Sequence, residues 1–284
     1  MFEELYHLYL RCFPEYPITL NLFLDLLKPQ EAYIIQKREQ TQLTGFAMIH
    51  ANSITLLCVD KPYRGKGIGS KLLKESEAYI AKSGADNIIL GRGRHYLLQG
   101  VPADKYNHVS FFETRGYTAQ WSSVNMSLSL EHFDRQSLRI PPCPEEIHFR
   151  FLRPEELPKL LIAVKNAQAN WVRIFENCSD PILIAESKGQ ILGFEILDPN
   201  GGRFVPLASD DQPANRVGSV GCVGVIHAAR EKGIGLQMVA GGLEWLKRQG
   251  CSSVELRYVE LVEWYGKLGF EMARHQWMGE KLYR

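Results

Sequence analysis

The stretch YRGKGIGSK, from Tyr63 to Lys71, has a near copy later in the chain, AREKGIGLQ, from Ala229 to Gln237. Each copy contains an arginine, two further residues, a glycine, one more residue and a second glycine. Arg64 and Arg230 hold the same place in the two copies. The distance between the copies is too long for a solenoid repeat, so it indicates a duplicated domain.

The composition suits a globular chain with two ordinary domains. At 284 residues the chain can form two domains of about 150 residues each, and 45% hydrophobic with 23% charged residues is normal for such proteins. The net charge of +1 gives no reason to expect a nucleic-acid or membrane partner. The N-terminus, MFEELYHLYLRCFPEY, has acids where a secretory signal needs basic residues, so we expect a cytoplasmic protein.

The six cysteines show no metal-binding or redox spacing. They are Cys12, Cys58, Cys143, Cys178, Cys222 and Cys251. No two of them form a CxxC pair, and no pair of histidines completes a zinc pattern. We therefore expect all six to be reduced and structural, and we expect no metal site.

The hydrophobic pattern predicts the same order of elements in both halves. The first half predicts helices at 2–12 and 19–27, strands at 32–37, 43–50 and 53–60, a helix after the glycine turn, a strand at 87–90, a helix at 108–117 and a strand at 122–130. The second half predicts a strand at 147–152, a helix at 154–167, strands at 181–187, 191–198 and 217–226, a helix after the turn, a strand at 253–258 and a helix at 261–270. Pro158 suggests that the helix at 154–167 starts late or kinks.

Prolines mark the boundary between the halves. Pro141, Pro142 and Pro144 lie among scattered charges. We predict an N-terminal domain at 1–130, a linker at 131–145 and a C-terminal domain at 146–284. A structured arm across the interface between the halves is an alternative.

Each glycine turn joins a strand to a helix, which is a geometry that suits phosphate. The first N–H groups of a helix have no partner within the helix, and they carry the positive end of its dipole. A phosphate group can be held there by backbone donors, and glycines allow a close approach because they have no Cβ. Arg64 and Arg230 add positive charge, so both turns suit a pyrophosphate.

Other phosphate-binding motifs fit less well. The pattern GxxxxGK[ST] is absent, and the dinucleotide motif GxGxxG needs a third glycine where Ser70 and Met238 stand. The alternative is that the two turns bind no ligand. The repetition of the same arginine and glycines in the same element order argues against that alternative.

The two stretches VDKPYRGKGIGSKLL and VIHAAREKGIGLQMV resemble the [RQ]xxGx[GA] motif of the GNAT N-acetyltransferases. The later stretches FFETRGY and EWYGKLGF resemble the signature of that family written fYeklGF. Each half carries both motifs, so the chain is similar to a tandem GNAT protein. This resemblance implies two tandem GNAT folds of the α/β (α+β) class. Each would be a mixed, mostly antiparallel sheet flanked by helices, with two strands that splay apart around acetyl-CoA.

The resemblance also implies a set of acetyl-CoA-binding residues in each half. The pantetheine arm would meet the backbone of Leu57, Cys58 and Val59 in the first half and of Val223, Gly224 and Val225 in the second. The pyrophosphate would lie on Arg64, Gly65, Lys66, Gly67, Ile68, Gly69 and Ser70, and in the second half on Arg230, Glu231, Lys232, Gly233, Ile234, Gly235 and Leu236.

The two halves differ in their proton donors. Acetyl transfer from a thioester to an amine benefits from a general acid at the leaving thiolate, and a tyrosine phenol, with a pKa of about 10, is protonated at neutral pH. In the family the tyrosine of fYeklGF commonly has this role. The second half has Tyr265 in that place and the first half has Phe112. We therefore assign catalysis to the second half, although a packing role for Tyr265 is an alternative.

The first half has an insertion, GRGRHYLLQGVPADKYN at 91–107, that could compensate. A long loop with titratable residues is often functional. Its candidates are Arg92, Arg94, His95, Tyr96, Asp104 and Tyr106. His95 can titrate near neutral pH, and a tyrosine can replace the missing phenol, but each residue can equally be a surface or packing residue.

A general base is expected from Glu195, within GFEIL of the second half. A carboxylate among apolar neighbours has a raised pKa, although strand alternation can also turn this side chain to solvent. His50 is the nearest counterpart of Glu195 in the first half. His227 is expected near the pyrophosphate rather than the acceptor.

Together these features predict an acetyl-CoA-dependent N-acetyltransferase that acetylates a primary amine by direct attack on the thioester. The acceptor is a small molecule or a peptide, and the chain is a monomer or a homodimer. One alternative is a non-catalytic acyl-CoA sensor or interaction module, which is motivated by Phe112 and by Lys105 and Tyr258 where the family usually has asparagine. Another is that both halves are only scaffold.

Overall fold

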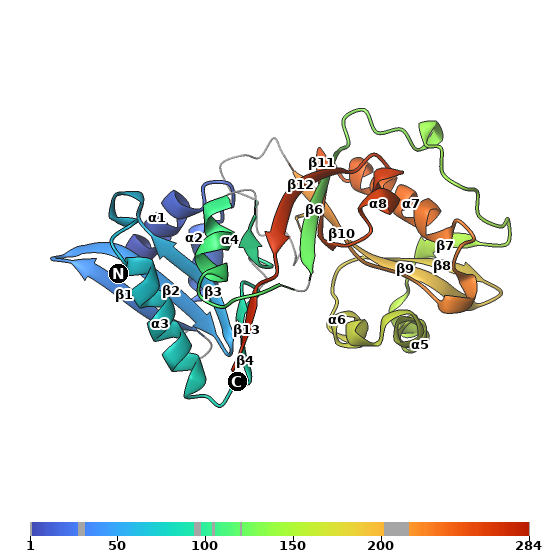
Figure 1. Cartoon of the computed structure of the whole chain (residues 1–284). Helices are drawn as coiled ribbons and strands as arrows, with labels where there is room; N and C mark the ends of the chain where they lie inside the picture. The colour runs from blue at the N-terminus through green and yellow to red at the C-terminus, as the bar shows by residue number, and fades with distance from the viewer. Residues whose placement is uncertain are drawn as a thin grey trace. The chain divides into compact units, whose positions relative to one another are not determined.

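The computed structural model describes residues 2–27, 32–93, 98–103, 106–119, 121–201 and 216–283. These residues form two compact units (Figure 1). Unit 1 holds the described residues up to Asn125 and from Arg274 onward, and unit 2 holds those from Met126 to Ala273. The chain enters unit 2 within strand β6 and returns to unit 1 within strand β12. The division at 1–130, 131–145 and 146–284 follows the sequence repeat, and as a division into domains it stays a prediction.

Unit 1 contains the elements that the sequence predicts, in the predicted order, and three that it does not, namely β5, β12 and β13. Its elements are α1 (Phe2–Cys12), α2 (Leu20–Leu26), β1 (Tyr33–Glu39), β2 (Gln42–His50), β3 (Ser53–Val59), α3 (Ile68–Ala81), β4 (Asn87–Leu90), β5 (Val101–Pro102), α4 (Tyr106–Glu113), the start of β6 (Ser122–Ser129), the end of β12 (Glu271–Trp277) and β13 (Glu280–Leu282). Thr19 caps α2 by accepting from the N–H of Leu22.

The sheet of unit 1 has the order β1-β2-β3-β4-β13. Strands β1, β2 and β3 are antiparallel neighbours, and β3 and β4 are parallel only where Ser53 faces Ile89 and Ile54 faces Leu90. The C-terminal strand β13 pairs antiparallel with β4, so the last strand of the chain completes the sheet of the first repeat.

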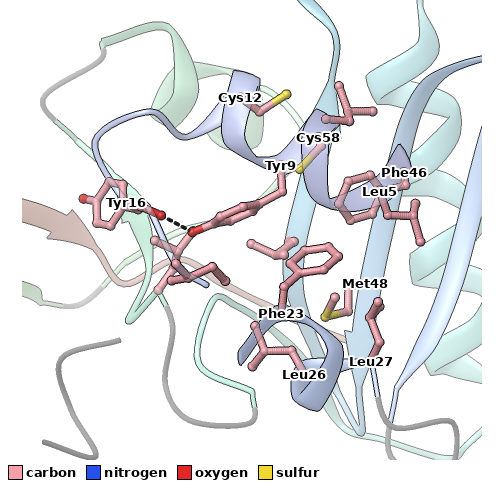
Figure 2. Packing of buried hydrophobic residues seen from close by; sticks show 14 of the residues in the cluster. Leu5, Tyr9, Cys12, Tyr16, Phe23, Leu26, Leu27, Phe46, Met48 and Cys58 are labelled. Carbon is pink, nitrogen blue, oxygen red and sulfur yellow. Dashed lines mark hydrogen bonds between the residues drawn. The ribbon is translucent and has the colours of Figure 1, made fainter. Parts of the chain in front are cut away.

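Two hydrophobic layers cover this sheet on opposite faces. Figure 2 shows α1 and α2 packed on one face, where Tyr9, Phe23 and Phe46 have no exposed surface and lie together with Met48. The phenol of Tyr9 donates to the carbonyl of Tyr16 over 2.5 Å. The opposite face packs against α3 through a second cluster, which consists of Ala47, Val59, Ile68 and Leu72. The alternation of side chains along β2 and β3 produces these two faces.

Unit 2 repeats this arrangement with different side chains. Its elements are the end of β6, β7 (His148–Phe151), α5 (Leu157–Gln168), α6 (Val172–Glu176), β8 (Ile182–Ser187), β9 (Gln190–Asp198), β10 (Val217–Val225), α7 (Ile234–Arg248), β11 (Ser253–Val259), α8 (Val262–Gly266) and the start of β12. Within this unit the strand order is β6-β11-β10-β9-β8-β7. Helix α5 begins at Leu157 after a 3-10 turn at Pro154–Glu156, which confirms the late start expected from Pro158.

Four elements were not expected from the sequence, namely β5, α6, β12 and β13. Strands β5 and β13 have only two and three residues, so they are too short to show alternation. Strand β12 reads EMARHQW, and its four N-terminal residues alternate neither in hydrophobicity nor in burial. These strands form because a tertiary partner is present, and the local sequence does not reveal them.

The helix that follows each glycine turn packs on the same face of its sheet, but the contact differs between the units. The strand registers pair Gly45 with Val59 and Gly193 with Val225, so Ala47 of β2 is the counterpart of Glu195 of β9. In unit 2 a Cβ on Gly242 of α7 would lie 2.3 Å from Oε1 of Glu195. The absence of a side chain at Gly242 makes room for the buried carboxyl group.

We predict that Gly242→Ala is destabilising by about 1–3 kcal/mol relative to Gly241→Ala. Both changes should gain about 1 kcal/mol of helix propensity, but a methyl group at 242 also meets Glu195 and Leu197, whose Cδ2 would lie 2.9 Å away. At 241 it meets only Nη1 of Arg135, at 3.6 Å. Urea denaturation measures both free energies of unfolding. Adding Glu195→Ala should reduce the cost at 242, and equal effects at the two glycines would contradict the packing argument.

Candidate functional site

Unit 1 contains a pocket of about 820 Å³ at the first glycine turn. Its walls are β3, the ends of β4 and β5, the first turn of α3 and one face of α4. Among the residues expected to bind acetyl-CoA, the lining includes Leu57, Val59, Arg64, Gly65, Gly67, Gly69 and Ser70. The side chains of Cys58 and Ile68 lie in the hydrophobic clusters, and Lys66 lies over the ring of Tyr63, with Nζ 5.0 Å from its centroid.

The pocket opens because β3 leaves both of its neighbours locally. Its pairing with β4 ends after Ile54. On the other side, the β2–β3 register passes from Met48–Leu56 to Ile49–Ile54, which leaves Thr55 as a bulge. The Thr55 hydroxyl lies 2.9 Å from Nδ1 of His50. Bulges of this kind turn backbone groups out of a sheet, and they are common beside active sites.

The first glycine turn presents an uncovered helix N-terminus to this pocket. Gly65 and Gly67 have φ angles of +77° and +81°, which glycine adopts without a steric cost. Gly67 is the residue before α3 and is exposed. Among the described residues, apart from its two neighbours in the chain, no atom lies within 4 Å of the place where its Cβ would stand. Free N–H groups at the positive end of a helix dipole favour an anion.

Two arginines add positive charge beside this helix end. Nε of Arg64 donates to the carbonyl of Val59 over 2.9 Å, which directs its guanidinium along the turn. Arg115 donates from Nη2 to the hydroxyl of Ser70 over 2.8 Å, and its guanidinium lies 4.0 Å from the ring centroid of Phe111. The sequence analysis missed Arg115. The signal was available, because this position is a leucine in the fYeklGF signature and is Leu268 in the second half.

Helix α4 contributes one face to the pocket. His108 and Phe112 are one helical turn apart and both line it, as expected for positions i and i+4 of a helix. Phe112 is buried and makes an edge contact with the ring of Tyr117. The imidazole of the half-buried His108 is therefore a titratable group on the pocket-facing side of α4. His95, Tyr96, Arg94 and Asp104 lie outside the described residues, as does the side chain of Tyr106.

In unit 2 the residues of the glycine turn are more covered than in unit 1. Val223 and Val225 are half-buried, whereas Gly224 is buried against Phe194. Arg230 donates to the carbonyls of Val225 and Ala167. Glu231 and Lys232 are exposed, Gly233 is half-buried, and the next three positions are buried, namely Ile234, Gly235 and Leu236. His227 is exposed, and its N–H donates to the side chain of Asn166.

Tyr265 and Glu195 lie near each other in unit 2. Burial raises the pKa of the Tyr265 phenol above its ordinary value, and Glu195 and Cys222 raise it further. The ring of Tyr265 contacts Trp264 and Phe270 edge-on. The phenol is therefore protonated at neutral pH, which is the state that a proton donor requires.

The carboxyl group of Glu195 is fully buried between β9 and α7. Cys222 and Val223 form a bulge opposite it, because the β9–β10 register passes from Ile196–Gly221 to Phe194–Gly224. Within the described part of the chain neither carboxyl oxygen has a hydrogen-bond partner, and burial raises its pKa to about 8. Contrary to the expectation from the sequence, His50 is not the counterpart of Glu195 in the first half. The strand registers place Ala47 at the position equivalent to Glu195 and place His50 at the position equivalent to Asp198.

All six cysteines are free thiols, as expected. Cys12 lines the unit 1 pocket, and its thiol lies 3.5 Å from the carbonyl of Val59. Within the described ranges no cluster of three or more His, Cys, Asp or Glu side chains is arranged to hold a metal ion. No helix in the described segments has the length and apolar character that crossing a membrane requires.

Comparison with known proteins agrees with this geometry. The model of the acetyltransferase (GNAT) family matches residues 2–96 and again residues 145–270. The chain belongs to the GNAT acetyltransferase family. The double match confirms the tandem arrangement, and acetyl-CoA is the acyl donor of the family.

One curated relative is the mycothiol acetyltransferase of Nocardia farcinica, which is 26% identical over 90% of this chain and 85% of its own length. Among solved structures, a tandem GNAT protein of the clavulanic acid pathway, solved without AcCoA, has a TM-score of 0.73 and 14% identity and covers 99% of this chain and 94% of its own. A glucosamine N-acetyltransferase region of a fungal multi-domain GH3 β-N-acetylglucosaminidase has a TM-score of 0.80 and 21% identity. That match covers 98% of this chain but 36% of the fungal chain. The solved structures establish the tandem fold.

We predict that the stability of the protein depends on pH through Glu195. Above about pH 4.5 the unfolded chain ionises this group, whereas the folded chain keeps it protonated up to about pH 8. The free energy of unfolding should therefore fall as the pH rises through this window, by up to about 1.4 kcal/mol per pH unit. Glu195→Gln keeps the shape and removes the titration. Urea denaturation of both proteins from about pH 5 to about pH 8 should give curves that diverge, and parallel curves would contradict the prediction.

We predict that Arg115→Ala weakens the binding of acetyl-CoA about tenfold, because a charge-assisted hydrogen bond to phosphate contributes roughly 1.5–3 kcal/mol. The loss should shrink at high salt. Calorimetric titration measures the dissociation constant. Arg248→Ala on α7, whose side chain is 67% exposed, is the matched control and should leave the constant unchanged. Equal binding by both variants would exclude Arg115 from the donor site.

Proposed function

We propose that this protein is an acetyl-CoA-dependent N-acetyltransferase that acetylates a primary amine, and that the unit 1 pocket holds the donor. The proposal rests on one observation. The open glycine turn, the unpaired edge of β3 and two arginines all surround one pocket of about 820 Å³. A pocket with an apolar lining and a few placed polar groups is typical of a ligand site.

The residues of the pocket fit the parts of acetyl-CoA. The N–H groups at the start of α3, with Arg64 and Arg115, suit the phosphates, and the β3 edge at Leu57 and Val59 suits the amides of the pantetheine arm. When bound, acetyl-CoA supplies the acetyl thioester. The bulge at Thr55 supports a role for nearby backbone groups in stabilising the developing oxyanion.

The acceptor amine must lose a proton, and the leaving thiolate must gain one. His108 is the residue that we assign to proton transfer in unit 1, because it lies on the same face of α4 as Phe112, one turn away, and lines the same pocket. An imidazole titrates near neutral pH, so it can both accept and donate a proton there. This assignment would explain how unit 1 can dispense with a tyrosine at position 112.

Catalysis in unit 2 by Tyr265 and Glu195 is the competing assignment within the same reaction class. The protonated phenol of Tyr265 favours it, because the phenol can donate a proton. The placement of Glu195 argues against a direct role for that residue, because its carboxyl group has no exposed surface and packs against the backbone of α7.

The relatives support an amine acceptor. One solved neighbour is described as a glucosamine N-acetyltransferase region, and glucosamine carries a primary amine on a sugar. We propose a small amine of this kind for the present chain, with a peptide amine as the alternative. We also propose that the protein is cytoplasmic and that it is a monomer or a homodimer.

We predict that the protein releases free CoA from acetyl-CoA in the presence of a suitable amine from a panel of amino sugars, amino acids and peptides. His108→Asn should lower kcat by about 100-fold or more and should leave acetyl-CoA binding within about twofold. Tyr265→Phe is the matched control and should keep the turnover. The reverse result would move catalysis to unit 2. Acetyl-CoA binding without transfer to any amine would instead favour the non-catalytic sensor.

A further inference from the structure

The second glycine turn differs from the first in what lies over it. Gly67 and Gly233 both precede a helix and have similar φ angles, +81° and +74°. In the described part of the chain no residue beyond its two neighbours comes within 4 Å of the Cβ position of Gly67, whereas a Cβ on Gly233 would lie 2.6 Å from the carbonyl oxygen of Pro142 and 2.9 Å from that of Pro141. Both prolines belong to the linker at 131–145, which packs within unit 2.

The linker is held along α7 by several polar contacts. Nε2 of Gln237 donates to the carbonyl of Pro141 over 2.9 Å, and Nη2 of Arg135 donates to Oε1 of Gln237 over 3.2 Å. Nη1 of Arg135 lies 3.7 Å from a carboxylate oxygen of Glu244. Nζ of Lys247 donates to two linker carbonyls, those of Glu131 and Phe133. The linker is therefore an ordered arm that packs on α7 within unit 2.

The position of the two proline carbonyls has an electrostatic reason. The start of α7 has unsatisfied N–H groups and a partial positive charge. Carbonyl oxygens carry partial negative charge, so they are favourable neighbours of this helix end, as phosphate oxygens would be. Residues 141 and 142 thus place acceptors of the chain itself at the turn that the sequence assigns to a pyrophosphate.

The second turn also lacks the polar groups of the first. The hydroxyl of Ser70 is replaced by the side chain of Leu236, which is 5% exposed. Arg115, which contacts Ser70, is replaced by Leu268, which is 1% exposed. These replacements are independent of the linker, and they remove two groups that would hold a phosphate.

We propose that the Pro141–Pro142 segment occupies the second glycine turn as an internal ligand, so that each chain binds one molecule of acetyl-CoA, in unit 1. This inference rests on the proposed function, since it takes acetyl-CoA as the ligand. It assigns different tasks to the two copies of the motif: the first turn binds the donor, and the second anchors the linker.

Calorimetric titration of acetyl-CoA into the full chain tests the stoichiometry. One binding event per chain is expected. Gly67→Ala should weaken it by about tenfold or more, because the new methyl group projects into the open turn. Gly233→Ala adds the same φ strain together with a methyl group within 3 Å of the carbonyl oxygens of Pro141 and Pro142, so it should lower the free energy of unfolding more than Gly67→Ala does. In the folded protein it should leave the dissociation constant within about twofold. Two events, or a single event that is lost in Gly233→Ala and kept in Gly67→Ala, would overturn the inference.

A second measurement follows the linker directly. Cys143 is a half-buried free thiol next to Pro142, and its alkylation can be located by mass spectrometry. Saturating acetyl-CoA should not change its rate of alkylation, and an increase would mean that the ligand displaces the linker. The double variant Arg135→Ala, Gln237→Ala removes the side-chain contacts that join Arg135 and Pro141 to α7, keeps those of Lys247, and should show a second, weaker binding event. Its absence would show that the linker does not close this turn. No binding in any variant would instead contradict the proposed function.

Discussion

The pairing of β3 with β4 stops after two residues, and the unit 1 site depends on where it stops. If the two parallel strands paired along their whole length, the edge of β3 would be closed by hydrogen bonds and no ligand could lie against it. The divergence after Ile54 leaves that edge open down to Val59. The chain then turns at Gly65 and Gly67 and begins α3 at the mouth of the same opening. The edge of β3 and the N-terminus of α3 thus line the same pocket, because only a short turn separates them in the chain.

Duplication preserved this scaffold and allowed its side chains to diverge. Ala47 and Ser76 of unit 1 correspond in position to Glu195 and Gly242 of unit 2, where the absence of a side chain at Gly242 makes room for the carboxyl group of Glu195. Close packing in unit 2 therefore couples the acid at 195 to the glycine at 242. Glu195 then has a raised pKa because it is buried without a counter-charge. The two repeats also differ at the position where unit 1 has Phe112 and unit 2 has Tyr265.

Much of the fold was predictable from local patterns. The period of apolar residues located most helices and strands within a few residues, because each long element buries one face. The turn at Tyr63–Lys71 and its copy predicted two equivalent strand–turn–helix units, and the family comparison confirms them. The pattern failed at β13, which has only three residues, and at β12, whose first residues do not alternate. Both strands take their hydrogen bonds from partners far away in the sequence. The pattern also failed for Arg115, whose importance comes from its contact with Ser70, 45 positions earlier in the chain.

The sequence by itself determined that the chain holds two GNAT repeats, each with a glycine turn suited to a diphosphate. It could do so because the glycines, the arginine and the helix that follows are neighbours along the chain and act through local backbone geometry. Only the tertiary structure decided that the turn at Gly67 is open and that the turn at Gly233 lies under Pro141 and Pro142. The reason is that accessibility depends on which distant segment packs over a turn, and two nearly identical turns carry no local record of that packing.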